Sequence, residues 1–207
     1  MSWFCSLRFG YHPPAFQLAA GCLLWWEVRA DRHLHIRQEW LFQHLDESDL
    51  ARQALTKTAA LGIPRIGYTV ADPILFPAKM AGPRGQYIAE SLSYYGWPVV
   101  PADAETFNGW KRVQSLLRLA PNGRPWLTID PSCTTLIQDL TAGMSDDQRP
   151  DEMSAEAPAL IALRYGAMSR PAPDRPVAKP VCPAGTPGYI MLRELHAHRQ
   201  HRWGWHG

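Results

Sequence analysis

The amino-acid sequence predicts an α/β domain built on a mixed β-sheet, and three observations support this fold class. Hydrophobic residues make up 46% and charged residues 19% of the 207-residue chain, which is the composition of a chain that folds around a core. The first 42 residues contain three strand-like stretches separated by turns, as in an antiparallel meander. Beyond residue 45, helical periodicity alternates with short apolar stretches, which favours parallel strands with helices on the faces of the sheet.

Three strands are expected in the opening part of the chain, over residues 3–8, 16–28 and 33–42. Gly10 and the rigid turn at Pro13 and Pro14 follow the first strand, and a turn at residues 30–32 joins the second to the third. The second strand is rich in Leu, Trp and Cys and is expected to be buried. The third begins with alternating apolar and polar residues, as a half-exposed strand does.

The later part of the chain is expected to alternate helices with short strands. A helix over residues 48–61 begins among acidic residues, which favour a helix N-terminus, and Gly62 ends it. The other expected elements are strands over residues 65–70, 98–100 and 126–129, and helices over residues 86–95, 108–119, 132–140 and 154–168. An antiparallel three-strand meander extended by parallel βα units and flanked by helices is the arrangement of the RNase H-like fold, which is therefore the predicted fold.

The composition changes after residue 170, which predicts a domain boundary there. Residues 1–170 are expected to form one domain, and residues 171–207 a proline-rich linker followed by a tail rich in His and Trp. Six prolines between residues 171 and 187 oppose helix and sheet formation. The tail contains four histidines that could bind a transition metal and two tryptophans that could dock on a partner, namely His196, His198, His201, His206, Trp203 and Trp205. Because neither an acid nor a cysteine flanks the histidines, a solvated tail is the favoured interpretation.

Charge and cysteine usage exclude several classes of protein. A formal net charge of +2 is too low for a strongly basic nucleic-acid-binding protein, but it leaves room for a local basic patch. The four cysteines form no C-x-x-C pair, and no secretory signal is expected at the N-terminus, which favours reduced thiols. No apolar run reaches the roughly 18 residues needed to span a bilayer, so no membrane association is expected.

Three segments of the chain carry a resemblance to a known protein family. They are residues 7–15 (LRFGYHPPA), residues 70–73 (VADP) with the later residues 109–113 (GWKRV), and residues 159–171 (ALIALRYGAMSRP). Together they resemble the C-terminal nuclease domain of the large terminase of tailed phages, the motor protein that packages viral DNA. Residues 125–140 and 150–152 are similar to the family's run of strand, cysteine, amphipathic helix and acidic approach to the closing helix. The resemblance covers residues 7–171 and implies the same RNase H-like fold.

The resemblance implies a two-metal endodeoxyribonuclease, in which several carboxylates hold two Mg²⁺ or Mn²⁺ ions. Among the family's acidic positions, only the one at the end of the fourth strand is matched, by Asp72. The first-strand Asp position is Arg8, the Asp position of the last helix is Ile161, and the family's His position one turn before it is Pro158. A fixed cation at Arg8 repels a metal ion and is expected to pair with Asp72, so the hydrolytic centre is expected to be impaired. Asp72 would bind metal only if the site were active. Asp72 is equally well explained as a residue that starts a turn before Pro73.

Other residues are considered for a substitute site or for structural roles. The acids that could substitute are Asp130, Glu27, Glu90 and Glu156, although each is also typical of a solvated surface or a helix cap. Cys133 matches a position where the family often has a cysteine, and it is expected to be a small buried core residue. Arg164 matches the family's closing helix and is expected to pair with an acid and to order that helix.

Basic residues after the Asp72 strand could bind the backbone of double-stranded DNA without reading its sequence. These predicted DNA-binding residues are Lys79, Arg84, Lys111, Arg112 and Arg118, with Trp110 as a stacking surface. The same residues are equally typical of an ordinary solvated surface.

Two functions therefore stay open. One is an endonuclease that depends on Mg²⁺ or Mn²⁺; the other is a non-catalytic DNA- or partner-binding module, from a packaging apparatus or a decayed prophage, that needs no cofactor. The sequence has no G-x-x-x-x-G-K-[ST] loop, so no ATPase activity is expected within it. The resemblance implies a location in the host cytoplasm and, as partners besides DNA, a portal, a small terminase or a separate ATPase chain.

Overall fold

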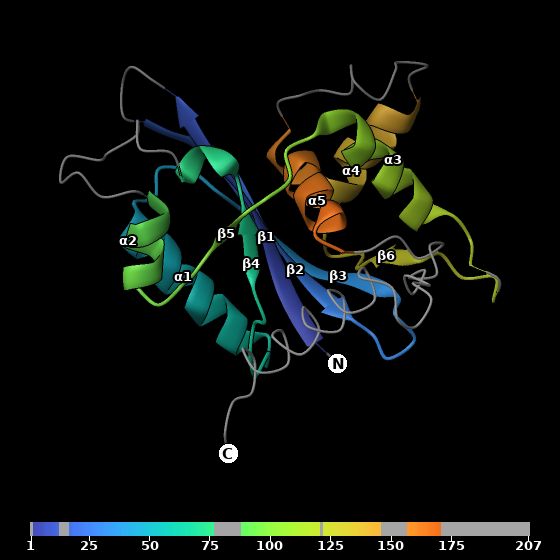
Figure 1. Ribbon diagram of the computed structural model, residues 1–207, viewed down its shortest axis with the longest axis horizontal. Helices are drawn as coiled ribbons and strands as arrows, with labels where there is room; N and C mark the ends of the chain where they lie inside the picture. The colour runs from blue at the N-terminus through green and yellow to red at the C-terminus, as the bar shows by residue number, and fades with distance from the viewer. Residues whose placement is uncertain (1, 13–16, 77–87, 121, 146–156, 171–207) are drawn as a thin grey trace, which may run out of the picture. The chain divides into compact units, whose positions relative to one another are not determined.

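A six-stranded mixed sheet forms the centre of the described structure, with the strand order β5-β4-β1-β2-β3-β6 (Figure 1). This computed structural model describes residues 2–12, 17–76, 88–120, 122–145 and 157–170. The chain divides into two units, Met1–Pro173 and Asp174–Gly207, and the second lies outside the described residues. The assignment of residues 171–207 to a linker and a tail with a histidine cluster therefore stays a prediction.

The three long strands pair in the predicted antiparallel meander. They are β1 (Ser2–His12), β2 (Gln17–Val28) and β3 (Leu34–Phe42), and β2 lies between the other two. Successive side chains of a strand point to opposite faces of the sheet. Along β1 and β2, Phe4 and Leu24 enter one apolar cluster, whereas Cys5 and Leu23 enter another on the opposite face. Burial on both faces explains why the second strand has a nearly continuous apolar sequence.

Three short strands extend the meander in parallel, as predicted. They are β4 (Thr69–Ala71), β5 (Val100–Pro101) and β6 (Leu127–Ile129). β4 pairs with β1, β5 with β4, and β6 with β3, so the opening strand is central and lies beside the fourth. β4 is shorter than the strand predicted over residues 65–70, because the chain reaches β1 only at Gly67, whose N–H donates to the Trp3 carbonyl at 2.7 Å. The predicted topology is confirmed.

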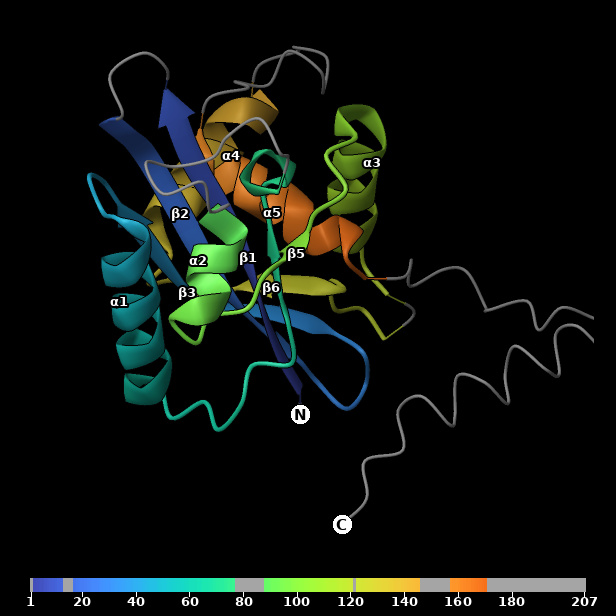
Figure 2. The same ribbon diagram turned by 60° about the vertical axis from the view of Figure 1, so that its left-hand side comes forward.

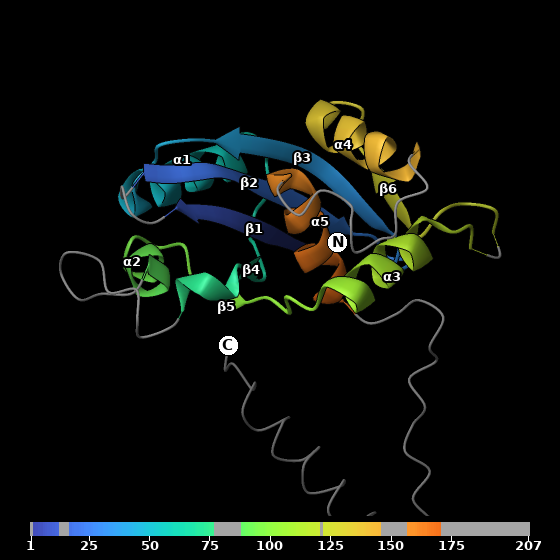
Figure 3. The ribbon, with the colours of Figure 1, turned by 90° about the horizontal axis from the view of Figure 1, so that it is seen from above.

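Helices cover both faces of the sheet (Figures 2 and 3). One layer comprises α1 (Glu47–Ala60) and α2 (Ile88–Tyr94), and the other α3 (Thr106–Leu117), α4 (Thr134–Ser145) and α5 (Pro158–Met168). α1 begins among acidic residues as predicted, and the Asp46 carboxylate accepts a hydrogen bond from Asp49 N at 2.8 Å. The helix expected over residues 86–95 ends at Tyr94, so Tyr95 lies just beyond it and is 43% exposed. Among the described helices, none combines the length and the hydropathy of a bilayer-spanning segment.

α5 is the most deeply buried helix of its layer, because every residue from Ala159 to Ala167 is buried. Apart from Arg164 the helix is apolar or aromatic, as expected for a helix enclosed by other elements. It approaches the sheet most closely at Gly166, where a β-carbon would meet the indole ring of Trp26 on β2. The same indole donates from Nε1 to Ser6 Oγ at 2.8 Å, which fixes the ring in place. Gly166 therefore sets how closely α5 packs on the sheet.

We predict that Gly166→Ala lowers the free energy of unfolding by roughly 1–3 kcal/mol, as expected for overpacking a core. The sign is informative, because Gly→Ala inside an unobstructed helix raises stability by about 1 kcal/mol. Urea denaturation of the wild-type and variant proteins measures the change. In a Trp26→Leu background, which removes the aromatic ring that obstructs a β-carbon at this position, the same substitution should be much less destabilising. An equal loss in both backgrounds would contradict the packing explanation.

Candidate functional site at the ends of β1 and β4

Asp72 follows β4 directly and starts the short 3₁₀ turn η1 (Pro73–Leu75). Its Oδ1 atom accepts a hydrogen bond from Ile74 N at 3.1 Å, and Pro73 occupies the first position of the turn. Asp72 therefore has the turn-forming role that its position before a proline predicts. The residue is nevertheless 4% exposed, so its charge needs a partner in the structure.

The partner is Arg8 of β1. The parallel pairing of the two strands places Leu7 opposite Ala71, so Arg8 and Asp72 come next to each other one residue further along. Asp72 N also donates to the Leu7 carbonyl at 3.2 Å, which continues the pairing beyond the end of β4. The pairing of Arg8 with Asp72 that the sequence predicts is present in the structure.

Arg8 Nη1 forms an ion pair with Asp72 Oδ2. The Oδ2 atom is fully buried and has no other partner among the described residues. The two side chains differ in exposure, at 6% for Asp72 and 30% for Arg8. The carboxylate is thus compensated inside the structure, while part of the guanidinium reaches the surface.

The α5 side of this ion pair is apolar and cationic. Ile161 is 8% exposed and packs with Val70 and Tyr165. Burial raises the pKa of the Tyr165 hydroxyl, and the nearby Arg8 cation counteracts part of this rise. Arg8 also adds to the burial that lowers the pKa of Arg164, so it lies close to both residues of the helix. The proximity of Tyr165 was missed in the sequence, although its spacing of four from Ile161 puts both on one helical face.

Arg164 connects α5 to the start of α3. Its Nη1 atom donates to the Ala104 carbonyl at 3.1 Å and to Thr106 Oγ1 at 2.6 Å. Gly109 of α3 lets the aliphatic part of the side chain pass, because a β-carbon there would overlap it. The expectation that Arg164 pairs with an acid is therefore corrected: its described partners are neutral oxygens. These bonds still support its expected structural role.

The residues at this site do not fit a pair of divalent ions. Two bridged ions need several carboxylates, but among the described residues the site offers only Asp72, which Arg8 already neutralises. Pro158 is the first residue of α5 and has no ligand atom in its side chain, and Ile161 is apolar. Within the described ranges, no cluster of three or more His, Cys, Asp or Glu side chains could hold a metal ion.

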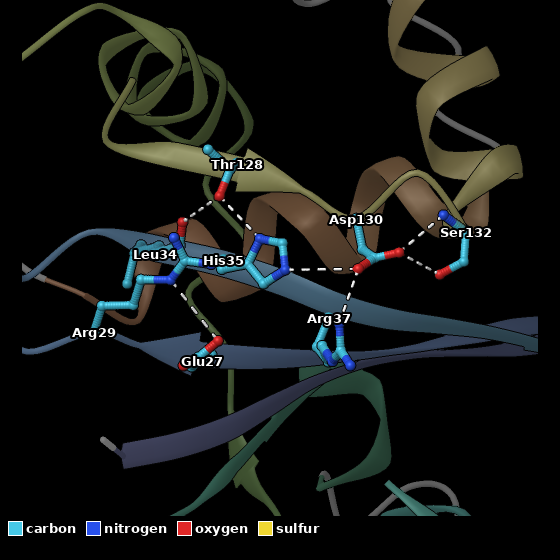
Figure 4. A network of polar contacts seen from close by, with 8 residues as sticks. All are labelled: Glu27, Arg29, Leu34, His35, Arg37, Thr128, Asp130 and Ser132. Carbon is cyan, nitrogen blue, oxygen red and sulfur yellow. Dashed lines mark hydrogen bonds and ion pairs between the residues drawn. The ribbon is translucent and has the colours of Figure 1, made fainter. Parts of the chain in front are cut away.

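The proposed substitute acids do not converge on Asp72. Figure 4 shows Asp130, beyond β6, where Oδ1 accepts from Ser132 Oγ at 2.7 Å and Oδ2 accepts from Arg37 Nη1 at 3.1 Å. The hydrogen bonds from Ser132 lower the pKa of Asp130. Three strands separate β6 from β4, so about 19 Å lies between these strands at about 4.8 Å per step.

The remaining substitute acids have other places. Glu27 lies opposite His35 on neighbouring strands and is 3.8 Å from Arg29 Nε (Figure 4). Glu90 lies in the first turn of α2, on the other layer, and Glu156 lies outside the described residues. Cys133 is fully buried as expected, and burial raises the pKa of its thiol to about 12, which suits a core residue rather than a nucleophile.

The predicted DNA-binding residues differ in their exposure and surroundings. Lys111 and Arg118 are exposed on and just beyond α3, and Lys111 Nζ lies 4.0 Å from the centre of the Phe107 ring. Trp110 is 5% exposed and belongs to the core, so its ring has no free face for a base. Arg112 is half-buried and donates from Nη2 to the Arg170 carbonyl at 2.5 Å. Lys79 and Arg84 lie outside the described residues.

The fold defines an RNase H-like domain, and it is similar to large terminase nuclease domains of known structure. The nuclease of the large terminase of thermophilic phage G20c is 16% identical over 82% of this chain and 82% of that one, with a TM-score of 0.51. The P22 large terminase nuclease domain is 14% identical, with coverage of 81% of each chain and a TM-score of 0.49. The SPP1 nuclease domain with bound Mn is 13% identical, with coverage of 78% of this chain and 85% of that one and a TM-score of 0.43.

The likeness to the phage G20c nuclease confirms the predicted fold. No protein-family model matches the sequence, and neither does any curated protein. At this level of identity the comparison establishes the fold, whereas the chemistry of the site has to be argued from this chain's own residues.

We predict that Arg8→Met lowers the free energy of unfolding at pH 7 by up to about 3 kcal/mol, because it leaves the Asp72 carboxylate buried and unpaired. Asn at position 72 keeps an oxygen for Ile74 N and carries no charge, so Arg8→Met with Asp72→Asn should recover at least half of the loss. Urea denaturation at pH 7 and pH 5 measures both variants. The deficit of the single variant should shrink at pH 5, because protonation of an unpaired buried carboxyl favours its folded state. A double variant as unstable as Arg8→Met would contradict the pairing.

Proposed function

We propose that this chain is a homologue of the DNA-packaging nuclease domain of large terminases that binds double-stranded DNA without cutting it. The observation that carries the proposal is the Arg8–Asp72 ion pair, at the position where the resemblance puts the first two metal-binding acids. Asp72 is the matched acid, and Arg8 takes the place of the other. The resemblance and the fold shared with the phage G20c nuclease support the homology.

The physical argument against hydrolysis is electrostatic. A divalent ion at Asp72 would have to displace Arg8 or lie beside its positive charge, and no second carboxylate of the described part of the chain lies nearby to bind it. The apolar contacts of Ile161 close the α5 side of the site. The described residues at the site therefore supply neither the ligands nor the negative charge that an activated water needs beside two metal ions.

Exposed basic side chains at α3 favour retained DNA binding. Lys111 lies on the exposed stripe of α3, Arg118 directly follows the end of that helix, and both side chains are exposed. Phe107, which is 50% exposed, belongs to the same stripe and is a better candidate than Trp110 for stacking. Such a surface suits phosphate contacts that position DNA without specifying sequence. Host cytoplasm as the location, and a portal, small terminase or separate ATPase chain as partners, belong to this proposal.

The direct test combines a plasmid-nicking assay with calorimetry. The purified protein should leave supercoiled plasmid intact in Mn²⁺ or Mg²⁺, and Mn²⁺ titration should give no heat that depends on Asp72. Asp72→Ala is the control for both measurements. Metal-dependent nicking or tight Mn²⁺ binding, lost in Asp72→Ala, would return the endonuclease function to first place.

A second prediction concerns restoration of the acids. We expect Arg8→Asp with Ile161→Asp to create Mn²⁺ affinity and weak nicking, because three carboxylates would then face one another. Without metal this variant should be less stable than wild type, since like charges are crowded and partly buried, and Mn²⁺ should raise its thermal midpoint. Arg8→Asn with Ile161→Asn is the matched control with neutral side chains of similar size. A midpoint that does not respond to Mn²⁺, or an equal response in the control, would contradict the proposed geometry.

A further inference from the structure

Two turns lie against each other at the end of the sheet remote from Asp72. The first, residues 29–33, joins β2 to β3, and the second, residues 118–126 apart from the undescribed residue 121, joins α3 to β6. Arg29 N donates to the His33 carbonyl at 2.9 Å within the first turn, and Leu34 N donates to the Trp126 carbonyl at 2.8 Å between them. Figure 1 shows the chain entering β6 beside the start of β3.

His33 holds the two turns together. The residue is 7% exposed, and its ring stacks on Trp126 at a centroid distance of 4.7 Å. Its Nδ1 atom is 2.9 Å from the Pro125 carbonyl, and Nε2 is 3.3 Å from Asn122 Nδ2. A carbonyl only accepts, so Nδ1 carries the proton and Nε2 accepts from the amide. These contacts fix the backbone of the two turns relative to each other.

The two turns expose three arginines without acidic partners, Arg32, Arg118 and Arg124. Among the described residues no ion pair involves any of them. The described residues of these turns include one acid, Asp31, whose Oδ1 atom accepts from His33 N at 3.2 Å. Arg29 is the fourth arginine, and Glu27 lies 3.8 Å from its Nε atom. The unpaired positive charge is thus concentrated on Arg32, Arg118 and Arg124.

Arg32 has a backbone conformation that glycine normally provides. Its φ angle is +67°, and its N–H donates to the Arg29 carbonyl at 3.0 Å, as in a tight hairpin turn. A residue with a β-carbon is disfavoured in this region, by about 1 kcal/mol or more relative to glycine. A strained residue that also carries an exposed, unpaired charge indicates a role for the side chain rather than for the turn.

We propose that Arg32, Arg118 and Arg124 extend the contact surface for the phosphate backbone of duplex DNA from α3 onto these two turns, away from the Arg8–Asp72 site. The choice of duplex DNA as the ligand rests on the proposed function. Six residue steps of β1 separate Arg8 from Ser2, which pairs with Val28 beside the first turn, so the two sites are about 20 Å apart at about 3.4 Å per step. α3 spans the distance between the two sites. Arg164 holds the start of α3 near Arg8, and Arg118 follows the end of α3.

The surface is tested by binding of a 30-base-pair duplex in EDTA, measured by fluorescence anisotropy over a range of salt concentrations. Replacing all three arginines by Gln should weaken binding roughly tenfold or more and lower the salt slope by about 2–3, since each phosphate contact contributes about 0.9. Arg52→Gln with Lys57→Gln and Arg65→Gln is the matched control, because it removes the same charge from exposed residues of α1 and the loop after it. The control should bind nearly as the wild type does.

Arg32→Gly separates a binding role from a structural one. Glycine adopts this backbone conformation without strain, so the thermal midpoint should stay the same or rise while DNA affinity falls. A triple variant that binds like the wild type, a control that loses as much affinity, or an Arg32→Gly protein with undiminished affinity would overturn the surface. If the wild type itself fails to bind the duplex, the proposed function fails together with this inference, whereas the other outcomes leave the proposed function standing.

Discussion

The parallel pairing of β4 with β1 is the constraint on which the candidate site depends. It brings together two segments more than sixty residues apart, and its register decides which side chains meet at the ends of the strands. A shift by one residue would turn Arg8 and Asp72 to opposite faces of the sheet. The register also puts Val70 and Asp72 on the face covered by α5, so that the apolar cluster around Ile161 and the ion pair are neighbours.

The same backbone arrangement can support opposite electrostatics. In an arrangement with acids at these positions, a cation from solution would balance the negative charge. Here the side chain of Arg8, which is part of the chain itself, supplies the balancing charge. A guanidinium forms directional hydrogen bonds and keeps its charge at any physiological pH. The fold is therefore compatible with either solution, and the difference between them lies in a few side chains rather than in the strands that carry them.

Much of the fold could be predicted from the sequence because it is encoded locally. The meander has strand-length apolar stretches bounded by turns, and the change to alternating helices and strands gives the parallel additions. The element boundaries were less accurate where tertiary contacts decide them: β4 is short because the chain meets β1 only at Gly67, and Tyr95 lies beyond the end of α2.

The site was only partly predictable. The pairing of Arg8 with Asp72 followed from the aligned positions. The partners of Arg164, however, are a backbone carbonyl and a hydroxyl, which no charge pattern reveals. A tryptophan such as Trp110 can stack on a base or pack in the core, and only the burial in the structure shows that it packs in the core. The turn at Arg32 shows the converse case, because an arginine where glycine is favoured becomes unusual only once its φ angle is known.

The ion pair also restricts how the sequence can change by single steps. Arg8→Asp alone would place two carboxylates side by side, one of them buried, with no cation between them. Ile161→Asp alone would bury a carboxylate against Val70 and Tyr165. Without metal, each single substitution is expected to lower the stability of the present chain, so a stepwise return to an acidic centre is hindered. The Arg8–Asp72 pair and the apolar surroundings of Ile161 thus make each single substitution toward an acidic centre unfavourable.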